Sequence, residues 1–356
     1  MYRRKAVFLW ESMKKRQKKN ILDRLKNDVV LSAEGYLFEL ERRGYIKAGA
    51  YVPEVVLDYP DAVRELHREL LRTGSEVMVA FTYYAHRSKL RVIGRENDLE
   101  PMNRQALRIA NEIAKEGDAL VAGNICNTWE YDHHRPKQTG NIVRAMYEEQ
   151  VQWAVEEGVD FIIAETIEYV EEALIALAVI KKYNLPAMVT LGATYEKSKD
   201  EYDWVEGCKM LEAAGADIVG FNCIRGPETM LPFLEKLRKN VSCYIAAQPV
   251  PYHTSAKRPA FQFLQFEQGN AYPLYLDQHL YNRFDAARYA IYAKEIGVNY
   301  IGLCCGAAPH HIRSMAEALG RTVPASKYSP DMSQHGLLGD ENVVKDHEKG
   351  FLKLWK

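Results

Sequence analysis

Short apolar segments alternate eight times with longer amphipathic segments along most of this chain of 356 residues. Continuous apolar segments of this length are typical of parallel strands that are buried on both faces. We expect strands at residues 29–33, 76–81, 119–123, 161–165, 187–191, 218–222, 244–248 and 300–304. We expect helices at residues 57–72, 101–116, 140–157, 170–183, 204–214, 227–238, 285–296 and 309–319.

Eight strand–helix units predict an α/β fold, specifically a (β/α)8 TIM barrel over residues 29–320. An open, doubly wound sheet is the alternative architecture. The longest expected connection, residues 249–282, is rich in aromatic residues and far exceeds an ordinary loop. A lid over the functional site or a subunit contact would explain its length, and we expect a homo-oligomer.

Segments of different character flank the expected barrel. Residues 1–28 are basic, with the run Lys14–Lys19, and predict a solvated helix or a loose arm. An arm that binds RNA or a partner is the alternative. The polar residues 321–356 predict a short C-terminal extension.

Composition excludes several classes of protein. Lys plus Arg is 47 and Asp plus Glu is 48, so no overall positive charge favours nucleic acid. The apolar runs are too short to cross a membrane, and no signal-peptide cleavage site follows the N-terminal apolar stretch. Six cysteines in a chain of this length do not indicate a disulfide framework, so we predict a cytoplasmic protein.

Three cysteines lie at the ends of two expected strands. Cys223 follows strand 218–222, Cys304 ends strand 300–304, and Cys305 follows it directly, before Gly306. Three thiolates can bind one zinc ion and leave its fourth position open, which is a catalytic arrangement. A thiol substrate at that position would be ionised, which predicts thiol alkylation. The alternatives are three small buried hydrophobic side chains, or a strained disulfide between the adjacent cysteines.

Polar residues follow other expected strands at the same end of the barrel, where TIM-barrel active sites lie. Glu165 closes an apolar strand, and we expect it to bind an ammonium group, with a salt bridge as the alternative. Glu34 follows the first strand, and Gly35 leaves room for backbone amides to approach a substrate carboxylate. Asn124 and Gln248 end two further strands, and we expect Gln248 to contact substrate.

Aromatic residues gather near the same end of the expected barrel: Tyr51, Phe81, Tyr83 and Tyr84. Aromatic faces attract quaternary ammonium and sulfonium groups, both of which donate methyl groups. We therefore predict that these residues bind a methyl donor. Core packing is the alternative, above all for Phe81.

From about Val29 to Leu319 the chain resembles the homocysteine S-methyltransferase family, in particular its betaine-dependent branch. The resemblance rests on the segments 34–49, 81–85 (Phe-Thr-Tyr-Tyr-Ala), 117–123, 220–223 (Gly-Phe-Asn-Cys), 248–254 and 302–306 (Gly-Leu-Cys-Cys-Gly), with 311–313. It implies a zinc barrel that transfers a methyl group to homocysteine and yields methionine.

By position, the resemblance implies that Cys223, Cys304 and Cys305 are the zinc ligands. Glu165 matches the acidic residue that holds the homocysteine amino group, and Tyr84 matches a tyrosine near the metal and the donor. Tyr51 stands where the betaine enzymes have a tryptophan around the donor.

The chain departs from the family pattern at three places. The family's aspartate after the first strand is Ala33 here, and we expect Glu34 to replace it from the next position. An aromatic residue that follows the strand-four glutamate is Thr166. The C-terminal dimerisation arm of the animal betaine enzymes is much shortened.

We therefore expect a zinc-dependent enzyme of methionine biosynthesis, whose partners are homocysteine and a small methyl donor. Glycine betaine is the first expected donor. A sulfonium, either dimethylsulfoniopropionate or S-methylmethionine, is the second, and another N-methylated betaine is the third. A barrel that binds zinc or an onium compound without turnover is the alternative.

Overall fold

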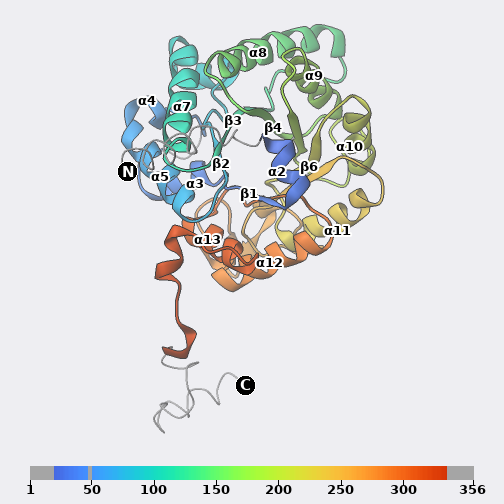
Figure 1. The fold of residues 1–356 in the computed structure, drawn as a ribbon. Helices are drawn as coiled ribbons and strands as arrows, with labels where there is room; N and C mark the ends of the chain where they lie inside the picture. Colours follow the sequence, from blue (N-terminus) through green and yellow to red (C-terminus); the bar gives the residue numbers. More distant parts are fainter. Residues whose placement is uncertain (1–19, 47–49, 335–356) are drawn as a thin grey trace, which may run out of the picture.

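A parallel eight-stranded sheet curls around the centre of the molecule in the computed structural model, which describes residues 20–46 and 50–334 (Figure 1). Its strands are β1 (Val30–Leu31), β2 (Val77–Val79), β3 (Leu120–Cys126), β4 (Phe161–Ile167), β5 (Ala187–Leu191), β6 (Ile218–Asn222), β7 (Tyr244–Gln248) and β10 (Tyr300–Ile301). They lie side by side in chain order, and β10 pairs with both β7 and β1.

The first and second strands meet at a seam that closes the barrel. The backbone N–H of Glu76, just before β2, donates to the Leu31 carbonyl at 2.8 Å. The Glu76 carboxylate also accepts from the Leu31 N–H at 2.9 Å. Sequential order with closure confirms the (β/α)8 barrel, and the open doubly wound alternative is wrong.

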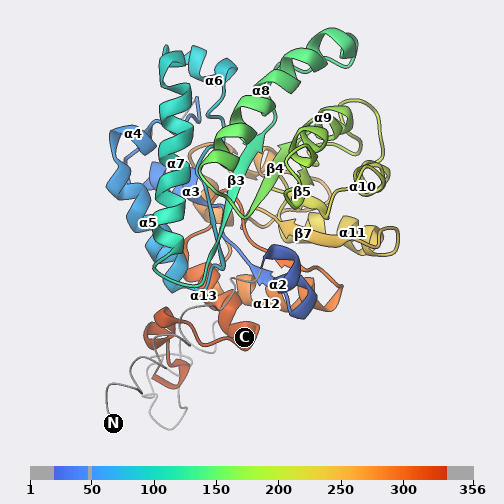
Figure 2. The ribbon, with the colours of Figure 1, turned by 45° about the horizontal axis from the view of Figure 1, so that its top comes forward.

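Helices surround this sheet on the outside (Figures 1 and 2). The eight that follow the barrel strands are α5 (Pro60–Arg72), α7 (Leu99–Ala114), α8 (Pro136–Glu156), α9 (Val170–Lys181), α10 (Trp204–Ala213), α11 (Pro227–Arg238), α12 (Arg283–Glu295) and α13 (Pro309–Ala318). Their sequences explain their positions, because each turns an apolar face inward. In α5, for example, Val63, Leu66 and Leu70 are buried.

The strands are buried on both faces, which explains their continuous apolar sequences. Every residue of β3, β4, β5 and β6 is buried. Aromatic side chains help to fill the interior of the barrel, where Phe161 of β4 and Tyr300 of β10 are in edge contact at 6.4 Å between ring centroids.

The structure differs from the expected elements in two ways. Strands β1, β2 and β10 are shorter than predicted, and β3 and β4 extend past their predicted ends. Four short helices were also not predicted: α2 (Ile21–Asn27), α3 (Tyr36–Arg42), α4 (Val55–Asp58) and α6 (Arg87–Val92). Helix α2 lies within the predicted basic arm but is not a solvated helix, since Ile21 and Leu25 are buried.

The long connection between β7 and α12 is ordered rather than featureless. It contains the helical turns η2 (Phe261–Phe263) and η3 (Leu276–His279) and the small hairpin β8 (Gln265–Phe266) and β9 (Gly269–Asn270). Tyr252 and Phe261 anchor it in the core. Its aromatic residues form part of the functional site described below, and its expected role as a subunit contact stays a prediction.

At the chain ends, residues 321–334 continue past α13 with the turns η4 (Pro324–Tyr328) and η5 (Met332–Gln334). Residues 1–19 of the predicted arm and 335–356 of the predicted extension lie outside the described residues, so these boundaries stay predictions. Within the described part, none of the helices has the length and apolar character needed to span a bilayer.

Candidate active site

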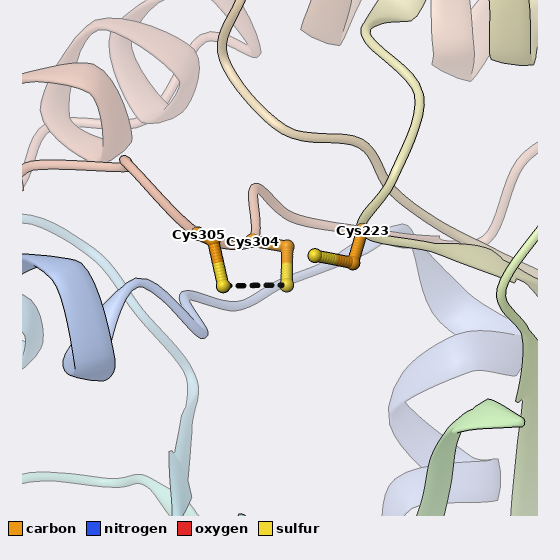
Figure 3. Close-up of side chains that lie close together, drawn as sticks. All are labelled: Cys223, Cys304 and Cys305. Carbon is orange, nitrogen blue, oxygen red and sulfur yellow. Dashed lines mark hydrogen bonds between the residues drawn. The ribbon is translucent and has the colours of Figure 1, made fainter. Parts of the chain in front are cut away.

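Three cysteine side chains converge at the carboxyl end of the barrel (Figure 3). Cys223 follows β6, and Cys304 and Cys305 follow β10. Their sulfur atoms all lie within 4.8 Å of one another, and the sulfurs of the adjacent pair are 3.9 Å apart. All three are free thiols, so Cys304 and Cys305 do not form the disulfide that was the alternative.

Local backbone geometry brings these sulfurs together. β10 ends at Ile301, so Cys304 and Cys305 lie in the loop and are free of the alternation that would point strand neighbours to opposite faces. Gly306 has φ +97° and permits the bend that follows. Cys223 itself has φ 53°, a left-handed conformation that is uncommon outside glycine and often found at functional sites.

The three thiols fit a soft cation. The Cys223 sulfur accepts hydrogen bonds from the other two thiols, which lowers the pKa of Cys223 well below its usual value. Soft sulfur donors at this spacing suit zinc and leave room for a further ligand. Two other groups of three candidate ligands are present among the described residues: Glu34, Glu165 and Cys304, and the loop residues Asp132, His133 and His134.

A small cavity, which we name the inner cavity, lies below the cysteines inside the barrel. Its volume is about 30 Å³, and it combines an apolar wall with two acidic side chains. It is lined by Glu34, Tyr36, Leu37, Val79, Ala80, Phe81, Tyr83, Asn124, Glu165, Cys223, Cys304 and Cys305.

Two buried carboxyl groups face this inner cavity. Burial raises the pKa of Glu34 to about 7. Burial and the nearby Glu34 charge raise the pKa of Glu165 well above its usual value. Neither oxygen of Glu34 has a hydrogen-bond partner among the described residues. A cationic ligand between the two groups would relieve both the repulsion and the missing contacts.

Two asparagines hold Glu165 in place. Asn124 donates to one carboxylate oxygen at 2.5 Å, and Asn222 donates to the other at 2.7 Å. Asn222 also accepts from the Thr166 N–H at 2.8 Å and from the Thr190 hydroxyl at 2.9 Å. Sequence reasoning did not assign Asn222 a role, although it directly precedes Cys223.

Gln248 and Gly35 occupy positions beside this cavity. Gln248 pairs with Asn222 across β6 and β7, and neither atom of its amide has a partner within the described chain. Gly35 lies so close to Ala307 that an added Cβ would approach the Ala307 carbonyl oxygen to 2.4 Å. Close packing thus explains this glycine, and its predicted contact with substrate stays a prediction.

A second, larger cavity lies beyond the cysteines, and we name it the outer cavity. Its volume is about 310 Å³. Aromatic residues dominate its wall, including Phe261, Phe263 and Tyr272 from the long loop. Its other lining residues are Leu37, Phe38, Tyr51, Tyr83, Tyr84, Asn127, Trp129, Thr166, Glu168, Thr194, Tyr195, Cys223, Ile224, Gln262 and Cys305.

The predicted aromatic residues divide between the two cavities. Tyr51 and Tyr84 line the outer cavity, Phe81 lines the inner one, and Tyr83 lines both. Phe81 stacks on Tyr36 with ring centroids 5.8 Å apart, so it also packs the core, as the alternative had proposed. The Tyr51 hydroxyl is hydrogen-bonded to the Tyr272 hydroxyl. The two residues are far apart in the sequence, so this contact was not predicted.

Comparison with known proteins assigns this chain to a family. The model of the homocysteine S-methyltransferase family matches residues 34–319. The chain belongs to that family. It is 38% identical over 343 residues to S-methylmethionine–homocysteine S-methyltransferase BHMT2 of Pongo abelii, which covers 94% of this chain and 90% of the relative. It is 36% identical over 336 residues to betaine–homocysteine S-methyltransferase 1 of Mus musculus, covering 91% and 80%.

Solved structures confirm the fold. The metallated form of the homocysteine methyltransferase MmuM from Escherichia coli superposes with a TM-score of 0.65 at 18% identity, covering 82% of this chain and 96% of that one. Family membership identifies the chain as a homocysteine S-methyltransferase, an enzyme, and thereby disfavours the alternative of a barrel without turnover.

Proposed function

We propose that this enzyme is zinc-dependent and transfers a methyl group from a carboxylate-bearing onium donor to homocysteine. One observation carries the proposal: Cys223 and Cys305 line both the inner and the outer cavity. A ligand at the three thiols would therefore face one substrate on each side.

Cys223, Cys304 and Cys305 would hold the zinc ion. When bound there, zinc would supply a Lewis acid that lowers the pKa of the homocysteine thiol and maintains a nucleophilic thiolate.

The inner cavity suits the amino-acid end of homocysteine. Glu34 and Glu165 present two carboxyls to its ammonium group, and Asn124 and Asn222 fix the Glu165 carboxylate. The unpaired amide of Gln248 is available for a further polar contact. A preorganised pair of acids would place the sulfur towards the cysteines without a large entropic cost at the moment of reaction.

The outer cavity suits the donor. Aromatic faces stabilise a positively charged onium group, and the apolar wall excludes water from the thiolate. As the methyl group moves to sulfur, the onium group becomes neutral, so no side chain has to remove a proton from carbon. Tyr84 and Tyr51 are the residues that we propose lie beside the donor.

Glycine betaine is the first donor that we propose, because the segments 81–85 and 302–306 and most of the chain resemble the betaine-dependent relatives, at 36% identity; the S-methylmethionine-dependent relative is similar to the same extent, at 38%. S-methylmethionine is the second candidate, favoured by one feature of the outer cavity. Glu168, which is paired with Lys199 at 2.6 Å, contributes to its wall, and S-methylmethionine carries an ammonium group that could compete with Lys199 for this carboxylate and that betaine lacks.

Replacement of one ligand tests the zinc proposal. We expect Cys305→Ala to lose bound zinc and at least about 1,000-fold in activity, while circular dichroism shows an intact barrel. Cys243→Ala is the control, because Cys243 is a partly buried thiol away from the three-sulfur group. Metal content is measured by mass spectrometry on protein purified without chelators, and methionine formation with each donor in turn.

Two outcomes would contradict the proposal. Full zinc content in Cys305→Ala would show that the ion is held elsewhere. Zinc-loaded wild-type protein that forms methionine from none of glycine betaine, dimethylsulfoniopropionate and S-methylmethionine would reject the donor class.

A further inference from the structure

A lysine lies against two aromatic rings of the outer cavity. Lys89, in helix α6, places its ammonium nitrogen 4.3 Å from the centroid of the Tyr84 ring and 4.2 Å from that of the Trp129 ring. Both rings line the outer cavity, and they contact each other edge to face at 6.1 Å. Lys89 is not itself a lining residue, so a positive charge lies behind two rings of the cavity that we assign to a positively charged donor.

Other cations near this cavity are already neutralised or committed. Lys199 forms an ion pair of 2.6 Å with Glu168. The Arg225 guanidinium donates to the backbone carbonyls of Ala193 at 2.6 Å and of Tyr195 at 3.2 Å. Within the described residues, the Lys89 ammonium group forms no ion pair with a carboxylate, and the groups near it are the two aromatic rings, the Cys126 thiol and the His86 ring. Burial lowers the pKa of Lys89, so its charge is held at a cost that an anionic partner would offset.

We propose that Lys89 is a specificity-determining residue that binds the carboxylate of the methyl donor. This inference rests on the proposed function and extends it. Glycine betaine, dimethylsulfoniopropionate and S-methylmethionine all combine an onium group with a carboxylate. Lys89 attracts the carboxylate. Because it has the same charge as the onium group, it repels that group from the faces of Tyr84 and Trp129.

Such a charge pattern orients the donor. With the carboxylate at Lys89, the onium group is directed towards the remaining aromatic wall, where Tyr51 and Tyr272 lie in the same cavity as Cys223 and Cys305. The methyl group would then face the sulfur of homocysteine. Lys89 therefore positions a donor and excludes onium compounds without a carboxylate, and it takes no part in the bond changes.

Two sulfonium donors that differ in the carboxylate provide the test: dimethylsulfoniopropionate, which has one, and trimethylsulfonium, which does not. We expect Lys89→Met to raise the KM for dimethylsulfoniopropionate about tenfold to about 100-fold, the usual effect of losing a charge-assisted hydrogen bond. The KM for trimethylsulfonium should fall, because the charge that repels it is gone, and the KM for homocysteine should change less than about twofold. Lys89→Arg should restore most of the loss, because it keeps the charge.

A neighbouring residue provides the matched control. Arg91→Met removes a positive charge from the same helix at an exposed position, and we expect it to leave all three KM values within about twofold of wild type. An equal increase for both sulfonium donors in Lys89→Met would overturn the inference, since Lys89 would then only support the packing of Tyr84. Unchanged KM values would overturn it as well.

Equilibrium binding separates this inference from the proposed function. Calorimetry with glycine betaine, in the absence of homocysteine, measures donor affinity without turnover. We expect Lys89→Met to bind betaine at least about tenfold more weakly than wild type, even if the wild type proves inactive with that donor. Equal affinities for the two proteins, or no binding of any of the three carboxylate donors to wild type, would reject the role of Lys89.

Discussion

Glu34 is an acid in an unusual position, because it lies one residue beyond the alanine that replaces the family's aspartate. The structure places its carboxyl in the inner cavity, in one group with Glu165 and Cys304. Under the proposed function, the chain would therefore retain two acidic groups for one ammonium ion although Ala33 itself is not acidic. Two like charges in a buried site are unfavourable until a cation arrives between them.

Replacing Glu34 should weaken the binding of homocysteine. We expect Glu34→Gln to raise the KM for homocysteine about tenfold to about 100-fold, because one half of the ammonium contact is lost, and to leave the KM for the donor within about twofold. Glu39→Gln, in helix α3 but outside both cavities, is the control. A change confined to the donor KM would show that Glu34 serves the outer cavity instead.

Part of the candidate site could be predicted from the types of residue that follow the apolar strands. The rest depends on contacts between residues far apart in the sequence, which local sequence does not indicate. Cys223, Cys304, Glu34 and Glu165 each stand where an apolar strand stops, so their chemistry was visible. Trp129 and Tyr272 lie in loops, and nothing in their local sequence indicates that they meet Tyr84 and Tyr51.

At the scale of elements, strand register decides which polar groups can cooperate. Asn222 of β6 reaches Glu165 and Thr166 of β4 across β5, and it joins three strands through one amide. The alternation of apolar strands and helices predicted these strands but not their register. For that reason the sequence suggested Glu165 as a ligand and left the residue that orients it without a role.

Gly220 sets the approach of β6 to β7. It pairs with Ala246, and an added Cβ would lie 1.9 Å from the Ala246 carbonyl oxygen. We expect Gly220→Ala to lower the free energy of unfolding by about 3 kcal/mol or more, or to prevent folding, since backbone atoms must move. Urea unfolding followed by circular dichroism measures the effect.

Gly140 of helix α8 is the matched control for that experiment. There the nearest atom to an added Cβ is the terminal methyl of Ile175 at 3.3 Å, which can shift. Gly140→Ala should leave stability unchanged or raise it by up to about 1 kcal/mol, because alanine is the better helix former. Equal losses in both variants would mean that neither loss reflects the strand contact.

At the scale of the whole molecule, three of the described histidines, His67, His86 and His311, are fully buried and held uncharged by that burial. Burial lowers the pKa of His67 and of His86 to about 3 and that of His311 to about 4. The His311 ring accepts from the Ala308 N–H and bonds the Tyr281 carbonyl, so protonation would break a contact. Between these values and about pH 6.5, the unfolded chain binds protons that the folded chain does not.

Stability should therefore fall as pH decreases from about 7.5 to about 5.5, with each buried histidine contributing about 1.4 kcal/mol. The raised pKa values of Glu34 and Glu165 act in the opposite sense, so the test compares variants. We expect His86→Phe to lose less stability over this range than wild type by about 1.4 kcal/mol. His134→Gln, at an exposed position, should behave as wild type in urea unfolding; identical losses in all three proteins would contradict the assignment.

The barrel could be predicted because the alternation of apolar and amphipathic segments repeats eight times along the chain. Structural features that occur only once in the chain could not be predicted in this way. Residues 21–27 are an example. Their basic composition suggested a solvated segment, but burial of the Ile21 and Leu25 side chains holds this helix against the barrel. Burial of two apolar residues outweighs the surrounding charges, which remain at the surface.

The seam at Glu76 has a consequence for chain connectivity. Arg24, near the start of the described chain, lies 3.7 Å from one Glu76 carboxylate oxygen, and Arg321, just past the last barrel helix, lies 2.5 Å from the other. Both ends of the barrel thus meet at one side chain. A short peptide between them would turn the barrel into a closed ring, and a cut at the exposed turn of Gly94 would open it elsewhere. Such a circular permutant should keep every contact of the candidate site. In a closed barrel the same strands pair with each other whichever strand comes first in the chain.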